Sequence, residues 1–258
     1  MAKSRWILNS HIDTTCYADA CDRIQQWASE SKSCYVVAAN VHVVMTAYWN
    51  PQYQQILEQA ALVTPDGMPL VWGLRQLGYS HQSRVYGPDL MLAWCRRAAS
   101  LQIPIYLYGG SETTLQKVSR YLKAQFPGLI VAGTHAPPFR PLTLEEEAVD
   151  VERIQQSGAQ VVFVALGCPK QEQWMARQQG QLNAVMIGVG AAFRFFSGEV
   201  SQAPRWMMRW GLEWAYRFSQ EPRRLWKRYF INNFAFVVLF GWQLLNLRLA
   251  ALLPIKKS

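Results

Sequence analysis

The sequence predicts an α/β protein built on a doubly wound, mostly parallel sheet of six strands. Six short apolar runs alternate along the chain with segments of helical periodicity, which is the pattern of repeated β-α units. The runs are mostly apolar, as expected for parallel strands that helices cover on both faces. The predicted strands span residues 34–40, 62–64, 103–110, 128–133, 161–167 and 184–190.

The helices between these strands are predicted from the spacing of apolar residues and from capping residues. A first helix over residues 14–30 carries apolar side chains at helical spacing, with Asp13 or Thr14 as its N-cap. Ser111 is expected to cap a helix, and Thr143 a later one that has three glutamates in its first turn. The remaining helices are expected over residues 51–60, 88–100, 112–125 and 170–179.

Positive charge is concentrated in the last quarter of the chain. The 258 residues carry a formal net charge of +9. Residues 194–258 hold 11 Lys and Arg against 3 Asp and Glu, so the first 193 residues carry a net charge of only about +1. We therefore expect two parts, an α/β domain over residues 1–196 and a basic, aromatic, helical appendage over residues 197–258.

The appendage has the composition of a surface that contacts lipid. Aromatic side chains recur every fourth residue after Pro204, and a mostly basic row lies one position earlier on the same expected helix. A second helix is expected from Pro222, and residues 229–247 carry no charge, about the length of a bilayer span. Polar residues interrupt this stretch, so a helix that lies in the membrane interface is favoured over a span. The aromatic row is Trp206, Trp210, Trp214 and Phe218, and the charged row is Arg205, Arg209, Glu213 and Arg217.

The same basic and aromatic side chains could bind nucleic acid, by stacking on bases and neutralising phosphates. The long uncharged segment after Arg228 favours a membrane surface as the partner.

Several classes of protein are disfavoured by what the sequence lacks. The five cysteines form no CxxC pair, which favours a reducing compartment, and the four histidines show no metal-ligand spacing. The first ten residues hold no apolar segment of the signal-peptide type. Neither G-x-G-x-x-G nor GxxxxGK[ST] occurs, so a nicotinamide dinucleotide and the usual NTPase loop are disfavoured. We expect neither a metal ion nor a cofactor.

Polar and glycine residues follow the predicted strands and define a candidate site. In a doubly wound sheet, ligands bind at the carboxyl ends of the strands. That rule brings together Asn40, Asp66, the segment 109–111, the segment 167–171 and the segment 188–191.

Each candidate also has a simpler structural interpretation. Asp66 is either a turn residue of Pro65-Asp66-Gly67 or a general base, and Asn40 either ends a strand or donates to a ligand hydroxyl. Gly109 and Gly110 form either a tight turn or a phosphate-binding helix start.

Two further positions leave the same choice open. Lys170 and Gln171 are either a solvated first helical turn or contacts to a nucleotide. Arg84 pairs either with a diphosphate or with a surface carboxylate.

Taken in order, these motifs resemble the WecG/TagA/CpsF family of glycosyltransferases, from the first predicted strand through Tyr229. The resemblance rests on the strand that ends at Asn40, on TPDGMPLVW and RVYGPDLM, on YLYGG, GTHAPPFRPL and GCPKQE, and on the long final segment GVGAAF…FSGEVSQAPRWMMRWGLEWAYRFSQEPRRLWKRY.

The resemblance implies a Rossmann-like fold of the type called GT-E and an inverting, metal-independent transferase. Such enzymes move a sugar, often N-acetylmannosamine, from a UDP-sugar to a polyprenyl-diphosphate-linked saccharide. They act as peripheral proteins at the cytoplasmic face of the plasma membrane, in the synthesis of surface polysaccharide. The sequence also allows a homo-oligomer.

The resemblance assigns roles to individual residues. Asp66 is implied as the catalytic base, with Asn40, Arg84 and Gln171 beside it. Further substrate contacts are expected at Gly109, Gly110, Lys170, Gly188, Gly190 and Arg194. The arginines expected to complete the site and bind the lipid carrier are Arg217, Arg224 and Arg228.

Two positions depart from the family pattern. Ala38 stands where members often have Thr, and Arg194 where many have Asp, so a hydroxyl is lost and a charge is reversed beside the cleft. These departures suggest two alternatives, an altered sugar specificity or a non-catalytic protein that binds a sugar nucleotide and a membrane. The arginine-tryptophan tail suggests an RNA-binding α/β protein as a third reading.

Overall fold

The computed structural model describes residues 4–252, except for the side chains of residues 227, 228 and 252. A six-stranded parallel sheet forms its centre, in the order β4-β3-β8-β7-β5-β6, so the predicted fold class is confirmed. The strands are β3 (Cys34–Ala39), β4 (Leu62–Pro65), β5 (Ile105–Tyr108), β6 (Val131–His135), β7 (Val161–Val164) and β8 (Val185–Gly188).

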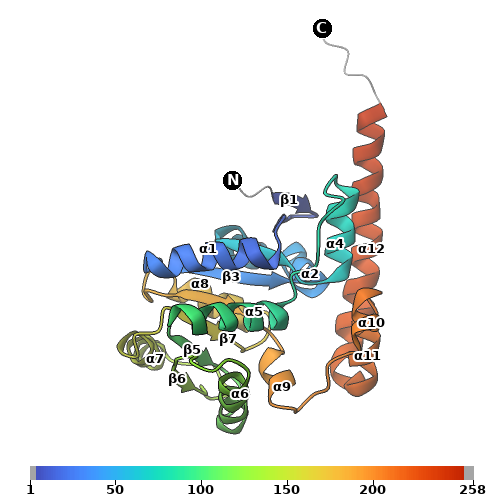
Figure 1. The fold of residues 1–258 in the computed structure, drawn as a ribbon. Helices are drawn as coiled ribbons and strands as arrows, with labels where there is room; N and C mark the ends of the chain where they lie inside the picture. Colours follow the sequence, from blue (N-terminus) through green and yellow to red (C-terminus); the bar gives the residue numbers. More distant parts are fainter. Residues whose placement is uncertain (1–3, 253–258) are drawn as a thin grey trace.

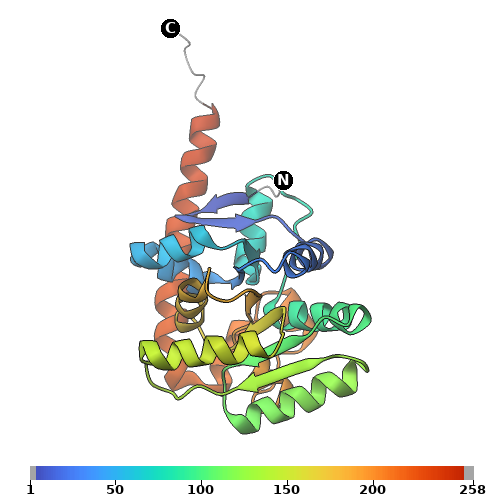
Figure 2. The same ribbon diagram turned by 90° about the vertical axis from the view of Figure 1, so that its left-hand side faces the viewer.

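Helices cover both faces of this sheet, as Figures 1 and 2 show. Alternate side chains of β3 enter two separate apolar clusters, Tyr35 and Val37 on one face and Cys34 and Val36 on the other. The first cluster is covered by α2 (Val41–Trp49), α3 (Pro51–Gln59), α7 (Leu144–Gln156) and α8 (Lys170–Gln178). The second is covered by α1 (Tyr17–Ser29), α5 (Gly87–Leu101), α6 (Glu112–Gln125) and α9 (Ala192–Phe196).

Two of the predicted helix caps are confirmed and one is wrong. Ser111 accepts a hydrogen bond from the Thr114 N–H, and Thr143 forms a capping box with Glu146. The first helix instead begins at Tyr17 after Cys16, without a side-chain cap. Asp13 is not available for capping, because it ends a strand and its carboxylate accepts the Val63 N–H at 2.8 Å.

Five of the observed elements were not predicted, among them the short helix α9. An antiparallel hairpin, β1 (Ser4–Ile7) with β2 (Ser10–Asp13), precedes the first helix. Two helices follow strand ends directly: α2 after β3, and α4 (Met68–Gln76) after β4.

The appendage begins with two short helices rather than one. The helix α10 (Arg205–Arg209) ends before Gly211, whose φ of 70° belongs to the left-handed region, and α11 (Glu213–Gln220) starts in a new direction. The single helix that the aromatic and basic rows implied is therefore wrong, and the two rows do not run along one face.

The last helix, α12 (Pro222–Leu252), runs along one side of the molecule and its C-terminal end projects past the α/β body (Figure 1). On one side of this helix, the side chains of Phe236 and Phe240 are buried in the apolar cluster that includes α2. By length and composition alone the helix could cross a membrane. Its exposed side chains include Phe230, Ile231, Phe234, Val237, Val238 and Trp242.

Candidate active site

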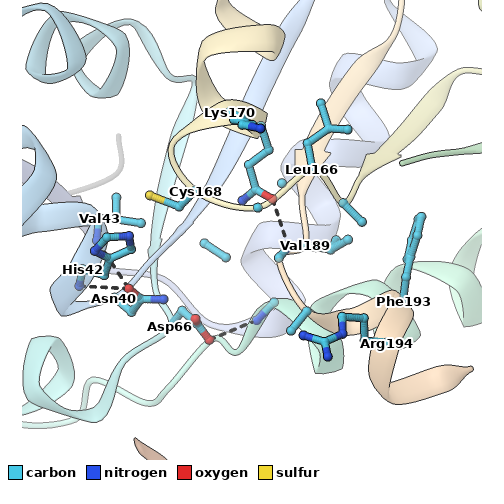
Figure 3. Close-up of a pocket in the computed structure, with 18 of the residues that line it drawn as sticks. Asn40, His42, Val43, Asp66, Leu166, Cys168, Lys170, Val189, Phe193 and Arg194 are labelled. Carbon is cyan, nitrogen blue, oxygen red and sulfur yellow. Dashed lines mark hydrogen bonds between the residues drawn. The ribbon is translucent and has the colours of Figure 1, made fainter. Parts of the chain in front are cut away.

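A cavity of about 780 Å³ opens at the carboxyl ends of the parallel strands. Loops after β3, β4, β7 and β8 line it, and α10, α11 and α12 supply another part of its wall. Figure 3 shows Asn40 and Asp66 on one side, Arg194 on the other, and Lys170 at the start of α8. The cavity gathers all predicted site residues except Gly109 and Arg228, and the side chain of Arg228 lies outside the described part of the structure.

Asp66 follows β4, and the backbone holds it in place. Its N–H and that of Gly67 both donate to the Ala39 carbonyl, at 2.8 and 3.2 Å. These bonds continue the hydrogen bonding between β3 and β4 into the turn after β4. The side-chain Oδ1 accepts the Gly87 N–H at 3.2 Å (Figure 3). Because the residue is only 9% exposed, burial raises the pKa of its carboxyl to about 6. This carboxyl can therefore gain or lose a proton near neutral pH.

Asn40 has a structural task in addition to its place in the cavity. It is the N-cap of α2, and its Oδ1 accepts the N–H groups of His42 and Val43 at 3.0 and 3.4 Å. The amide nitrogen of the same side chain also lowers the pKa of Asp66 by hydrogen bonding. The two possible roles of Asn40 are thus compatible, since different atoms perform them.

Arg84 joins the two parts of the chain. Its Nε donates to the carbonyl of Asp66, and its Nη2 donates to Glu213 Oε2 at 2.6 Å. The guanidinium also lies over the ring of Tyr86, 4.1 Å from the ring centre. Its partner is therefore a carboxylate of the appendage inside the cavity rather than a carboxylate on the surface.

Gln171 is buried and braces the loop after β8. Its Oε1 accepts the Gly190 N–H at 3.2 Å, and its Nε2 donates to Glu172 at 2.6 Å. Gly188 lies close beside it, since a Cβ there would lie 2.9 Å from Nε2 of Gln171 and one of the two would have to shift. Glu172 itself is fully buried, which raises the pKa of its carboxyl.

The two glycines after β5 have different surroundings. Gly109, with a φ of 113°, lies so close to Ala165 that a Cβ would meet that backbone at 2.9 Å. Gly110 lines the cavity and leads into Ser111, the N-cap of α6. The turn interpretation therefore accounts for Gly109, whereas Gly110 has direct access to a ligand.

The arginines at the appendage side of the cavity differ in their surroundings. Arg194 pairs with Glu221 at 3.2 Å and with Glu199 at 3.8 Å, and Arg224 pairs with Glu221 at 2.8 Å. The Nε of Arg217 is buried, and the described residues give it no hydrogen-bond partner. An anionic ligand would satisfy that donor.

Glu213 and Tyr86 are cavity residues that the motif analysis did not single out. Glu213 looked like one member of the charged row on a single helix. The turn at Gly211 redirects it into the cavity, where Tyr86 donates to its Oε1 at 2.9 Å. The sequence did offer one signal that could have singled out Glu213, since it is the only carboxylate in an otherwise basic row.

Within residues 4–252, no group of three or more His, Cys, Asp or Glu is arranged to hold a metal ion. Any neutralisation of a bound diphosphate by the described side chains would therefore come from Arg and Lys, with helix N-termini beside them.

Comparison with known proteins relates the chain to glycosyl transferases. A profile of the glycosyl transferase WecG/TagA/CpsF family matches residues 5–250. An N-acetylglucosaminyldiphosphoundecaprenol N-acetyl-beta-D-mannosaminyltransferase of Bacillus spizizenii is 31% identical over 220 residues, which is 85% of this chain and 79% of that protein.

Proposed function

The chain belongs to the WecG/TagA/CpsF family of glycosyl transferases, and on that premise we propose that it moves N-acetylmannosamine or a related hexose from a UDP-sugar to a polyprenyl-diphosphate-linked saccharide. The similar protein of Bacillus spizizenii is named for an N-acetylmannosamine transfer to a lipid diphosphate that carries N-acetylglucosamine. The single observation that carries the proposal within this chain is the buried Asp66 carboxyl, with a pKa of about 6, facing a cavity rich in arginine.

Asp66 acts as the general base in this proposal. Its carboxylate takes the proton from an acceptor hydroxyl while that oxygen bonds to the anomeric carbon of the donor sugar. The bond from the anomeric carbon to the diphosphate breaks, and its electron pair leaves with UDP. Attack from the side opposite the leaving group inverts the configuration at that carbon.

The departing diphosphate needs positive charge around it. Arg217 is the best placed candidate, because its buried Nε lacks a partner among the described residues. Lys170 and Gly110 line the same cavity at the starts of α8 and α6, where helix N-termini attract anions. We assign the lipid carrier's diphosphate to Arg224, which is the more exposed of the appendage arginines that line the cavity.

We place the reaction at the cytoplasmic face of the plasma membrane, with the chain held there as a peripheral protein. The exposed apolar side chains of α12 support contact with lipid. All five cysteines are free, which supports a reducing compartment.

The test is a screen of UDP-sugars against a short polyprenyl-diphosphate-sugar acceptor, with product analysis by mass spectrometry. Asp66→Asn should lower turnover by roughly 10²–10⁴-fold, the usual contribution of a general base, and leave UDP-sugar affinity nearly unchanged. Unchanged turnover in this variant would return Asp66 to the role of a turn residue. UDP-sugar binding without transfer by the wild-type chain would favour the non-catalytic alternative.

The appendage is the subject of a second test. Deleting everything after Phe196 removes Glu213, Arg217 and Arg224 from the cavity wall. We expect the truncated chain to lose transfer even to an acceptor analogue that needs no membrane. Full activity after truncation would show that the appendage serves membrane binding alone.

A further inference from the structure

Two carboxylates compete for one guanidinium in the cavity. The Nη2 atom of Arg84 lies 2.6 Å from Glu213 Oε2 and 3.7 Å from Asp66 Oδ1. All three side chains are less than 20% exposed, so water screens this contact weakly. Arg84 therefore forms its short ion pair with Glu213 of the appendage and only the longer one with Asp66, the candidate base.

Glu213 is itself held in position. Tyr86 donates to its second oxygen at 2.9 Å, and the ring of Tyr86 also supports the guanidinium of Arg84. Each oxygen of Glu213 thus has one partner, and both partners come from the segment just before or at the start of α5. The carboxylate is built into the site rather than placed on its rim.

The electrostatic consequence acts on Asp66. The positive charge of Arg84 lowers the pKa of that carboxyl, whereas the negative charge of Glu213 raises it, on top of the larger effect of burial. The charged and titratable groups that face Asp66 are Arg84 and Tyr86 before α5, Tyr17 on α1 and Glu213 on α11. Asn40 adds an amide from the start of α2.

We propose that Glu213 is a positioning residue for the transfer reaction, which holds Arg84 away from Asp66 and so keeps that carboxylate free to accept a proton. The inference rests on the proposed function for its catalytic meaning. The contact between the two domains has a consequence here, since Glu213 reaches Arg84 only when α11 lies against the α/β body. Docking of the appendage then closes the cavity and also sets how readily Asp66 accepts a proton.

Removing Glu213 should let Arg84 turn to Asp66. With no competing carboxylate, the guanidinium can close the 3.7 Å gap to Asp66 Oδ1. It would then bind the side-chain carboxylate of Asp66 while it keeps its contact with the backbone carbonyl of the same residue. A base paired in this way holds its negative charge more firmly and takes a proton less readily.

The first measurement needs no substrate. The full chain is labelled with ¹³C at the aspartate carboxyl, and the Asp66 resonance is identified as the one missing from Asp66→Asn. We expect its titration midpoint near pH 6 in the wild type and about one pH unit lower in Glu213→Gln. Glu213→Asp keeps the charge and should keep most of the wild-type midpoint.

The matched control is a different ion pair across the same contact. Arg205 on α10 pairs with Asp89 at 2.6 Å outside the cavity, so Arg205→Gln removes a cross-contact pair without touching Arg84. The Asp66 midpoint should stay at its wild-type value in this variant. An unchanged midpoint in Glu213→Gln, with the variant folded by circular dichroism, would overturn the proposal.

The second measurement asks whether the effect reaches catalysis. The acidic limb of kcat/KM should move to lower pH in Glu213→Gln by the same amount as the resonance, and the rate above the limb should fall several-fold. An unshifted limb beside a shifted resonance would overturn the catalytic part of the proposal. A wild-type chain that transfers no sugar would count against the proposed function, while the resonance would still decide whether Glu213 acts on Asp66.

Discussion

At the scale of single residues, the buried carboxyl of Asp66 lowers the stability of the folded state at neutral pH. The pKa of its carboxyl is 3.8 when exposed and about 6 in the folded protein, chiefly because burial disfavours the charged form. The folded state therefore binds this proton more tightly than the unfolded state does. By linkage, stability falls as the pH rises from about 4 through 6, and it stays reduced above that range.

Replacing Asp66 should therefore stabilise the protein at neutral pH. Asp66→Asn keeps an oxygen for the Gly87 N–H but removes the buried charge, so we expect a gain of up to about 3 kcal/mol at pH 8. The gain should shrink as the pH falls and vanish below about pH 4. Urea unfolding of both proteins at several pH values measures this difference, and a less stable variant at pH 8 would contradict the assignment.

At the scale of elements, the turn between α10 and α11 determines where the appendage reaches the cavity. Gly211 has a φ of 70°, and a Cβ at this position would lie 2.7 Å from the ring of Trp72 on α4. Both the backbone conformation and the close approach require glycine. This turn directs Glu213 towards Arg84, because it ends α10 and lets α11 start in a new direction.

Gly211→Ala should loosen the appendage. The left-handed conformation costs an alanine roughly 1–2 kcal/mol, and the contact with Trp72 adds to that figure. We expect earlier urea unfolding and faster proteolysis between residues 197 and 222. The control is Gly241→Ala in α12, where a Cβ meets no atom within 4 Å and the helix should gain up to about 1 kcal/mol. Equal effects of the two substitutions would refute this account of the turn.

Elements with an unambiguous local pattern could be predicted from the sequence, and the others could not. The six strands are short and mostly apolar runs, and each was predicted at its observed place within a few residues. The helix α2 was missed because Val41, Val43, Val44, Met45 and Ala47 are all buried, which leaves too few polar positions to reveal a helical period. The helix α4 has no side-chain cap to announce its start.

The candidate site divides in the same way. Residues that follow strands, such as Asp66 and Asn40, were predicted because parallel strands bring their carboxyl ends to one edge. Glu213 lies 147 residues after Asp66 and 173 after Asn40, and no local rule relates such distant segments. The predicted rows of aromatic and charged side chains were misleading here, because that prediction assumed one continuous helix through Gly211.

At the scale of the whole molecule, the last helix is fastened to the first hairpin. The side chain of Gln243 accepts the Leu8 N–H at 2.8 Å and donates to the Trp6 carbonyl at 3.0 Å. Phe240 contributes packing against Gly73 of α4 nearby. Segments from opposite ends of the described chain therefore hold α12 against the α/β body.

Gln243→Leu should detach this contact while keeping the helix. The loss of two hydrogen bonds to backbone groups costs about 1–3 kcal/mol locally, so the Leu8 amide should exchange its hydrogen faster. Asn246→Leu is the control, because Asn246 is exposed and has no hydrogen bond among the described residues. Hydrogen exchange measured by mass spectrometry over residues 4–13 reads both variants. Slow exchange in the Gln243 variant would mean that other contacts hold the helix.

The exposed apolar side of α12 should bind lipid. Phe234 is 74% exposed, so Phe234→Asp removes apolar area without disturbing the core and should weaken vesicle binding by at least roughly tenfold. Gln116→Asp on α6 adds the same charge at an exposed position far from α12 and should leave binding unchanged (Figure 1). Flotation with vesicles of anionic lipid measures both. Equal binding of the two variants would exclude this side of α12 as the lipid contact.

The contact between Gln243 and the hairpin also bears on how the protein is made. The hairpin is synthesised before α12, and Gln243 follows Leu8 and Trp6 by 235 and 237 residues. At 5–20 residues per second, that interval is on the order of 10–50 seconds, in which the α/β body can fold without the appendage. Until Glu213 has been made, the nascent chain holds Asp66 and Arg84 without the carboxylate that forms the shorter ion pair with Arg84. The ion pair between Arg84 and Glu213 is therefore among the last contacts of the cavity to form, shortly before the exposed apolar side of α12 is complete.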